Sequence, residues 1–134
     1  MPATQVLDSH ALLAYFRGEE NGVRVRDLLD KAAASDRRLQ MTDVNYAELK
    51  YILLKKDGAA AWQQVEEVLK SLPIDFLGTT RVLADTAADL KARYKISLAD
   101  AFAAALASEK KAELVTGDPE FKPLEKEVKI LWLK

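Results

Sequence analysis

Hydrophobic residues along the chain follow two alternating patterns. Short β-prone apolar runs are separated by longer stretches in which apolar positions recur every three or four residues, the spacing of one helix face. The short runs predict strands at residues 4–7, 38–41, 73–77, 113–116 and 128–133. The longer stretches predict helices at residues 9–16, 23–34, 43–56, 59–69, 80–94 and 97–111, with a loop at 18–22. Because strands and helices alternate throughout, we predict an α/β fold with a central parallel sheet flanked by helices on both faces.

Polar residues at the ends of the helical stretches predict where the helices begin and end. Ser9, Thr42 and Ser97 stand at the starts of three stretches, and their side chains are typical N-caps. The pair Asp57-Gly58 predicts the end of the third helix. The charged segment 122–129 is expected to lead into an edge strand.

Composition narrows the possible chemistry. The 134 residues are 49% hydrophobic and 31% charged, which predicts a single domain over residues 1–134. Cysteine is absent, which excludes disulfides, zinc–thiolate sites and thiol nucleophiles. The single histidine, His10, excludes zinc sites built from several histidines, and we interpret it as structural. No apolar run approaches the ~18 residues of a membrane helix, and no signal peptide is evident, so a cytoplasmic location is expected.

The charge balance leaves carboxylates as the candidate functional groups. The chain has 20 Lys and Arg residues against 21 Asp and Glu residues, a net charge of -1. This balance argues against tight, generic binding to phosphate backbones. It leaves hard divalent cations, which prefer carboxylate oxygens, as candidate ligands.

Two acidic residues directly follow predicted strands. Asp8 comes after the first strand, and Asp118 comes after the fourth strand and one glycine. Ligands of open α/β sheets bind beyond the carboxyl ends of the strands. If the two strands are neighbours, Asp8 and Asp118 project into the same crevice.

Two further acidic residues lie on predicted helices. Glu48 is surrounded at helical spacing by Val44, Ile52 and other apolar positions, so it is not on a purely polar helix face. Asp100 lies three residues after Ser97, at the start of an alanine-rich helix that can pack closely against the sheet. A buried carboxylate without a partner is costly, so these positions favour a bound cation.

Each acid also has a structural interpretation. Asp8 can be a turn residue, and Asp118 before Pro119 can be a helix N-cap. Asp100 can complete a capping arrangement with Ser97, and Glu48 can pair with Lys55. The ordered set of four is what favours a functional interpretation.

The chain resembles the PIN-domain family and, within it, the VapC-type toxins. The matching segments are VLDSHALL (Val6–Leu13), NYAEL (Asn45–Leu49), ISLADAFAAALA (Ile96–Ala107) and LVTGDPEF (Leu114–Phe121). Their order and spacing match that family over essentially the whole chain. The resemblance implies a PIN-like fold with a parallel sheet of about five strands.

The resemblance also implies a metal-dependent ribonuclease. Asp8, Glu48, Asp100 and Asp118 match the four family acids, which bind Mg²⁺ or Mn²⁺ and serve catalysis, with Glu48 as a ligand or as an orienting base. Ser9 and Thr116 match positions where hydroxyl groups support such a site. Asn45 stands where relatives often carry Ser or Thr. The implied partners are an RNA substrate, a VapB-type antitoxin and a second copy of the chain.

Two other functions are alternatives for this sequence. The alternatives are a PIN-domain nuclease of RNA processing that is not a toxin, and a PIN-like module that binds RNA or protein without cleaving. A haloacid-dehalogenase-type phosphatase requires Asp two residues after Asp8, where this chain has His10. The five scattered glycines form neither a P-loop nor a dinucleotide-binding motif.

Overall fold

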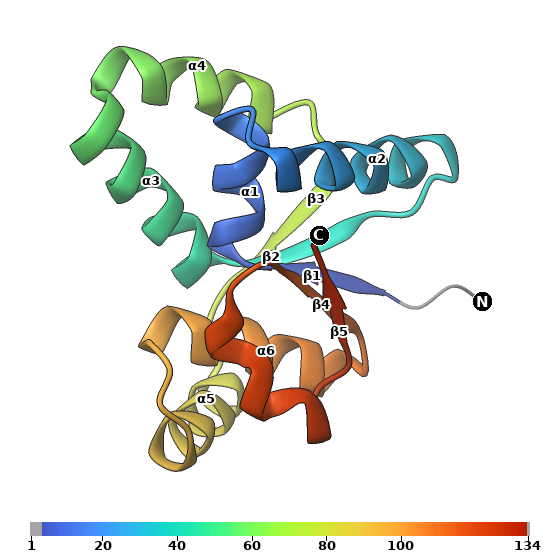
Figure 1. Cartoon of the computed structure of the whole chain (residues 1–134), viewed down its shortest axis with the longest axis vertical. Helices are drawn as coiled ribbons and strands as arrows, with labels where there is room; N and C mark the ends of the chain where they lie inside the picture. The colour runs from blue at the N-terminus through green and yellow to red at the C-terminus, as the bar shows by residue number, and fades with distance from the viewer. Residues whose placement is uncertain (1–3, 134) are drawn as a thin grey trace.

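The computed structural model describes residues 4–133 and contains one parallel sheet (Figure 1). The strands lie in the order β3-β2-β1-β4-β5, and every neighbouring pair is parallel. The strands are β1 (Gln5–Leu7), β2 (Leu39–Thr42), β3 (Ile74–Leu77), β4 (Glu113–Thr116) and β5 (Ile130–Trp132). This arrangement confirms the predicted α/β fold and places β1 at the centre of the sheet.

Helices cover both faces of the sheet, as the alternating pattern predicted. The helices are α1 (Ser9–Phe16), α2 (Glu20–Ala34), α3 (Asp43–Asp57), α4 (Ala59–Leu69), α5 (Arg81–Arg93), α6 (Leu98–Lys110) and the 3₁₀ helix η1 (Pro119–Lys126). Figure 1 shows α1 to α4 on one side of the sheet and α5, α6 and the η1 segment on the other. No helix within residues 4–133 has both the length and the apolar character needed to cross a bilayer.

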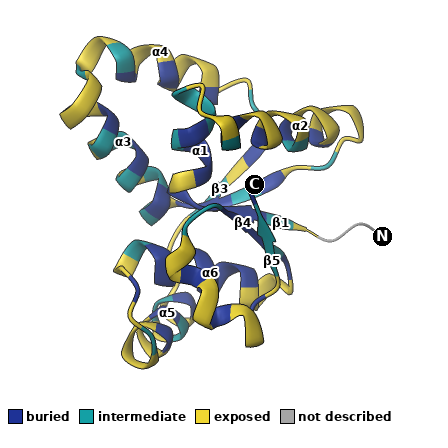
Figure 2. Ribbon diagram, in the orientation of Figure 1, coloured by how far each residue is buried: buried dark blue, intermediate teal, exposed yellow. Residues whose placement is uncertain are grey.

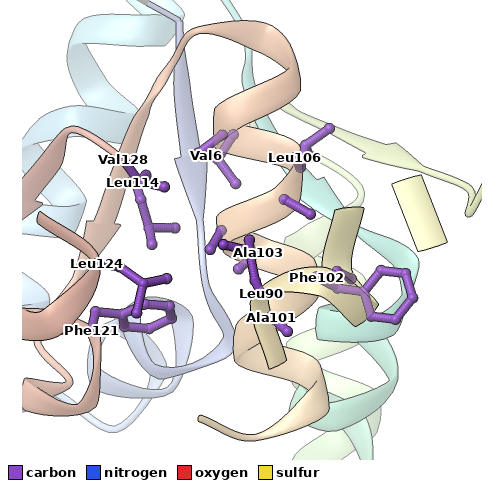
Figure 3. Packing of buried hydrophobic residues seen from close by; sticks show 14 of the residues in the cluster. Val6, Leu90, Ala101, Phe102, Ala103, Leu106, Leu114, Phe121, Leu124 and Val128 are labelled. Carbon is purple, nitrogen blue, oxygen red and sulfur yellow. The ribbon is translucent and has the colours of Figure 1, made fainter. Parts of the chain in front are cut away.

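The core consists of two apolar layers, one on each face of the sheet (Figure 2). Successive side chains of a strand point to opposite faces. Val6 and Leu114 therefore contact the α5, α6 and η1 layer, while Leu7 and Val115 contact the layer of α1 to α4. Figure 3 shows the first layer, in which Phe121 and other residues of η1 pack near Leu114. Small buried alanines along α6 allow that helix to approach the sheet closely.

Two of the three predicted N-caps are confirmed and one is wrong. The side chain of Thr42 accepts a hydrogen bond from the backbone of Asn45, and that of Ser97 accepts one from the backbone of Asp100. Ser9 is instead the first residue of α1. The cap of α1 is Asp8, whose carboxylate is long enough to reach the free N–H groups of the first turn.

Helix α2 begins at Glu20, so the predicted loop at residues 18–22 is shorter than expected. Gly22 lies on the buried face of α2, in line with Val25 and Leu29. A Cβ atom at this position would lie 2.3 Å from the backbone oxygen of Ala14. Gly22 is therefore a close contact between two helices, although in the sequence it looks like a turn residue.

The charged segment near the C-terminus does lead to an edge strand, as predicted. Part of that segment forms η1, whose N-cap is Asp118, as the structural interpretation of Asp118 before Pro119 expected. The length of η1 was not predicted, because its buried apolar positions Phe121 and Leu124 are isolated among charges. Strand β5 begins later than predicted because the backbone N–H of Val128 still donates to the carbonyl of Leu124 at the end of η1.

Candidate metal centre at the carboxyl edge of the sheet

The candidate site lies where strands β1 and β4 end side by side. Leu7 of β1 is paired with Val115 of β4, and the backbone N–H of Asp8 donates to the carbonyl of Val115. The chain connects β1 to β2 on one side, whereas β4 lies on the other side. Such a reversal of strand order opens a crevice at the carboxyl ends of the strands.

Asp8 lies at the bottom of this site and is 1% exposed. Its Oδ1 accepts a hydrogen bond of 2.8 Å from the N–H of Ala11, and its Oδ2 accepts one from the hydroxyl of Thr116. Burial raises the pKa of Asp8 to about 6, although these hydrogen bonds oppose the rise. The structural and functional interpretations of Asp8 are thus compatible, because Oδ1 caps α1 while Oδ2 contacts Thr116 of β4.

Thr116 and Ser9 are the two predicted supporting hydroxyls, and they contact different elements. The hydroxyl of Thr116 donates to Asp8 and accepts a 3.0 Å hydrogen bond from the backbone N–H of Asp118, so it connects both strand-end acids. The hydroxyl of Ser9 donates to the backbone carbonyl of Asn45, 3.0 Å away. Ser9 therefore joins α1 to α3, and within residues 4–133 its hydroxyl forms no hydrogen bond with a carboxylate of the site.

Asp100 is 8% exposed, and its pKa is raised further than that of Asp8. Its pKa is raised to about 8, first by burial and then by the negative charges of Asp8 and Asp118, with smaller contributions from Glu120 and Glu48. The perturbation shows that acids from distant parts of the sequence lie close to Asp100. Like charges that converge in a poorly hydrated place favour protonation or a bound cation.

Glu120 is a member of the site that was missed in the sequence. Carboxylate oxygens of Asp100, Asp118 and Glu120 all lie within 4.8 Å of one another. Asp118 Oδ1 accepts a 2.9 Å hydrogen bond from the N–H of Glu120, and this tight turn directs Glu120 back toward the crevice. The available signal is the Asp-x-Glu spacing after the fourth strand: the sequence predicts Asp118 as a ligand or as a helix cap but assigns no role to Glu120.

Glu48 approaches the same space from α3. A cavity of about 250 Å³ is lined by Glu48, Asp100, Asp118 and Glu120, together with polar and apolar neighbours. Glu48 is half-buried, and within residues 4–133 it forms no ion pair with Lys55, whose side chain is exposed. The cavity therefore brings together three of the four predicted acids, while Asp8 lies buried next to them.

Asn45 connects the elements that carry the acids. It is fully buried, and its Nδ2 donates to Ser9 Oγ at 3.2 Å and to the carbonyl of Ala99 at 3.1 Å. Its Oδ1 accepts from the hydroxyl of Thr42 at 2.5 Å. These contacts join α1, α3 and the start of α6, the three helices next to Asp8, Glu48 and Asp100.

Residues 6–127 match the family model of the PIN domain. The chain belongs to the PIN domain family. Comparison of its sequence with curated proteins finds no match.

Solved structures share the fold of this PIN domain at low sequence identity. DNA-bound VapBC from Salmonella typhimurium has a TM-score of 0.77 and 16% identity, covering 98% of this chain and 99% of that chain. VapBC2 from Rickettsia felis, bound to a promoter DNA fragment, has a TM-score of 0.75 and 17% identity, covering 98% and 99%. VapC20 from Mycobacterium tuberculosis, titled a sarcin–ricin loop cleaving toxin, has a TM-score of 0.69 and 16% identity, covering 90% and 95%.

The acids of this PIN domain fit a hard divalent cation. Within residues 4–133, none of them forms an ion pair with Lys or Arg; they are Asp8, Glu48, Asp100, Asp118 and Glu120. All their donor atoms are oxygens, the ligands that Mg²⁺ and Mn²⁺ prefer. The charges that raise the pKa of Asp100 are the charges that a cation would neutralise.

Proposed function

We propose that this PIN domain is a metal-dependent endoribonuclease and the toxin of a type II toxin–antitoxin pair. The observation that carries the nuclease activity is the convergence of acids without basic partners: carboxylate oxygens of Asp100, Asp118 and Glu120 lie within 4.8 Å of one another. Burial, together with the neighbouring charges, raises the pKa of Asp100 to about 8. The toxin role is supported by the shared fold with VapBC complexes and with VapC20.

Mg²⁺ is the proposed cofactor, with Mn²⁺ as a substitute. Asp8, Asp100 and Asp118 are the proposed ligands, direct or through water, and Glu120 joins them because of its place beside Asp100. Glu48 is a further ligand or the base that orients the attacking water. When bound, the cation makes a water molecule more acidic and neutralises charge on the scissile phosphate.

The remaining residues of the site hold these carboxylates in place. Thr116 fixes Asp8 and the backbone of Asp118 relative to each other, which keeps two strand-end acids in one orientation. Asn45 holds the three helices that bring in the other acids. Glu48 lies in the wall of the cavity outside the tight group of three, which suits contact with water or RNA at the rim.

The proposed partners are a VapB-type antitoxin and a second copy of the chain. Four apolar helix residues bear on dimerisation: Leu53, Trp62 and Val65 are buried in the core of the single chain and do not supply a dimer surface, whereas Leu54 is 38% exposed. Exposed apolar side chains on α5 and α6 include Val82, 66% exposed, and Leu98, 53% exposed. We propose that a homodimer forms through exposed apolar side chains such as these.

The nuclease activity is tested with purified protein and a pool of cellular RNA. We expect cleavage with Mg²⁺ or Mn²⁺, loss of cleavage with EDTA, and at least a ~100-fold slower rate for Asp8→Asn, because ligand loss exceeds the 10–100-fold cost of altering an outer contact. Glu109→Gln, which neutralises an exposed acid of α6, is the matched control and should cleave like the wild type. Absence of RNA cleavage with either metal would contradict the proposed activity.

The toxin role requires a separate experiment in cells. Induced expression of the wild type is expected to arrest bacterial growth, because uncontrolled RNA cleavage stops protein synthesis, whereas Asp8→Asn at equal abundance leaves growth unchanged. Colony counts and immunoblots measure the two quantities. Cleavage in the purified system without growth arrest would indicate an RNA-processing nuclease instead of a toxin.

A further inference from the structure

A second cavity borders the metal site on the opposite side of one short turn. It has a volume of about 280 Å³ and is lined by Gly117, Pro119, Lys122, Glu125 and Trp132. Asp118, between Gly117 and Pro119, lines the cavity of the acidic site. The two cavities therefore receive alternating residues of one turn, Gly117 and Pro119 on one side and Asp118 and Glu120 on the other, so a single RNA strand can contact both.

Trp132 is held firmly beside the strand that carries the site. It is paired with Thr116 across β4 and β5, and the next residue, Leu133, donates its N–H to the carbonyl of Thr116 at 2.9 Å. Its indole Nε1–H donates to Glu125 Oε2 at 2.8 Å. This bond uses the only polar hydrogen of the indole, so the remaining exposed surface of the ring is aromatic carbon.

The other walls of the cavity are suited to the sugar and phosphate of a nucleotide. Pro119 adds an apolar ring, and Gly117 has no side chain. A Cβ atom at this position would lie 2.7 Å from Nδ2 of Asn21, so that side chain would have to shift. Lys122 is exposed and, within residues 4–133, forms no ion pair. Its ammonium group is therefore available to a phosphate.

We propose that this cavity binds a nucleobase of the RNA strand next to the scissile phosphate. The base stacks on Trp132, and Lys122 contacts the adjoining phosphate. Unpaired RNA is recognised in this way, by aromatic stacking combined with positive charge. The inference rests on the proposed nuclease function, and it assigns to Trp132 a substrate contact outside the acidic site.

The test compares RNA with and without bases. The probes are a fluorescently labelled uridine dodecamer and the matching abasic ribose-phosphate dodecamer, titrated with the Asp8→Asn protein in Mg²⁺ so that the RNA stays intact. Trp132→Leu in that background is expected to weaken binding of the uridine dodecamer about 5- to 100-fold, the effect of losing one stacked base. Binding of the abasic dodecamer is expected to stay unchanged. Trp132→Phe, which keeps an aromatic ring, restores most of the affinity for uridine.

Two lysine variants test the phosphate contact. Lys122→Ala is expected to reduce the salt dependence of binding by about 0.7 in the slope of log K against log salt, the value for one single-strand phosphate. Lys110→Ala removes an equally exposed lysine at the opposite end of α6 from Asp100 and should leave the slope unchanged.

Two outcomes would overturn the inference. Equal loss of affinity for both dodecamers would mean that Trp132 acts only through the fold or the phosphates. Unchanged affinity for both would mean that the cavity receives no base, as expected of a site for a protein segment. Neither outcome depends on cleavage, which is measured separately with the wild type, so failure of the nuclease proposal is recognised independently.

Discussion

Asp100→Asn is expected to reduce RNA cleavage more than about 100-fold while it stabilises the metal-free protein at pH 8 by about 1–3 kcal/mol. Cleavage falls because the variant loses a proposed ligand at the centre of the acidic site. Stability rises because burial and neighbouring charges oppose ionisation of this carboxyl, which raises its pKa to about 8. An amide in the same place carries no charge. Activity and stability are therefore expected to change in opposite directions, as they often do at functional sites.

The stability effect has a definite pH dependence. An Asp in the unfolded chain has a pKa of about 4, so between pH 4 and 8 the unfolded state releases a proton that folded Asp100 retains. Stability of the metal-free wild type therefore falls as pH rises through this range. Asp8, with a pKa of about 6, adds a loss of the same sign between pH 4 and 6. Below pH 4 both carboxyls are protonated in the folded and unfolded states, and the stabilities of the wild type and Asp100→Asn converge.

Urea unfolding in EDTA at several pH values measures these stabilities, and Mg²⁺ titration completes the experiment. Mg²⁺ at one hundred times its dissociation constant is expected to stabilise the wild type by about 2.7 kcal/mol at pH 8, with little effect on Asp100→Asn. Glu109→Gln serves again as the exposed-acid control and should follow the wild type at each pH. A variant that is less stable than the wild type at pH 8 would show that Asp100 does not carry an unfavourable charge.

The fold was predictable because its local patterns agree with its tertiary contacts. Strand β1 is short, yet Val6 and Leu7 belong to opposite core layers, which is the burial on both faces expected of a central parallel strand. The predicted end of the loop before α2 was wrong because glycine has two physical uses. Glycine permits turns, and it also permits two helix backbones to pack closely. At Gly22 a Cβ atom would lie 2.3 Å from the backbone oxygen of Ala14, and only the packed helices reveal this contact.

The site was predictable where strand ends position the acids and less so elsewhere. Asp8 and Asp118 follow strands, and the pairing of β1 with β4 meets the condition under which the sequence predicts that they share one crevice. Glu120 was missed because its approach to Asp100 depends on the turn after Asp118, which no periodic pattern reports. For Glu48 the predicted apolar surroundings were only partly correct, since Ala47 and Tyr51, two of the apolar positions at helical spacing from it, are exposed. Its place in the site comes from the packing of α3 against its neighbours.

Asn45→Leu is expected to lower the free energy of unfolding by about 2–4 kcal/mol, because it leaves buried polar partners without their hydrogen bonds. The replaced side chain is fully buried and bonds to Ser9, Thr42 and the carbonyl of Ala99. Leu has the same number of side-chain heavy atoms as Asn and branches at the same carbon, so no cavity forms and loss of hydrogen bonding dominates over loss of packing. Urea unfolding in EDTA measures the change. Thr86→Val, which removes a solvent-exposed hydrogen bond from the half-buried Thr86 to the carbonyl of Val82, is the control and should change stability by less than about 0.5 kcal/mol.

If Asn45 also positions the carboxylates of the site, a second effect is expected that a purely stabilising role does not produce. Under conditions where the variant is fully folded, its affinity for Mn²⁺ is expected to fall about 10- to 100-fold, the usual cost of removing a contact that orients ligands. The cause is the release of the start of α6 from α1, which moves Asp100 relative to Asp8. Calorimetric titration with Mn²⁺ measures this affinity. If the folded variant binds Mn²⁺ as tightly as the wild type, Asn45 stabilises the fold without organising the carboxylates.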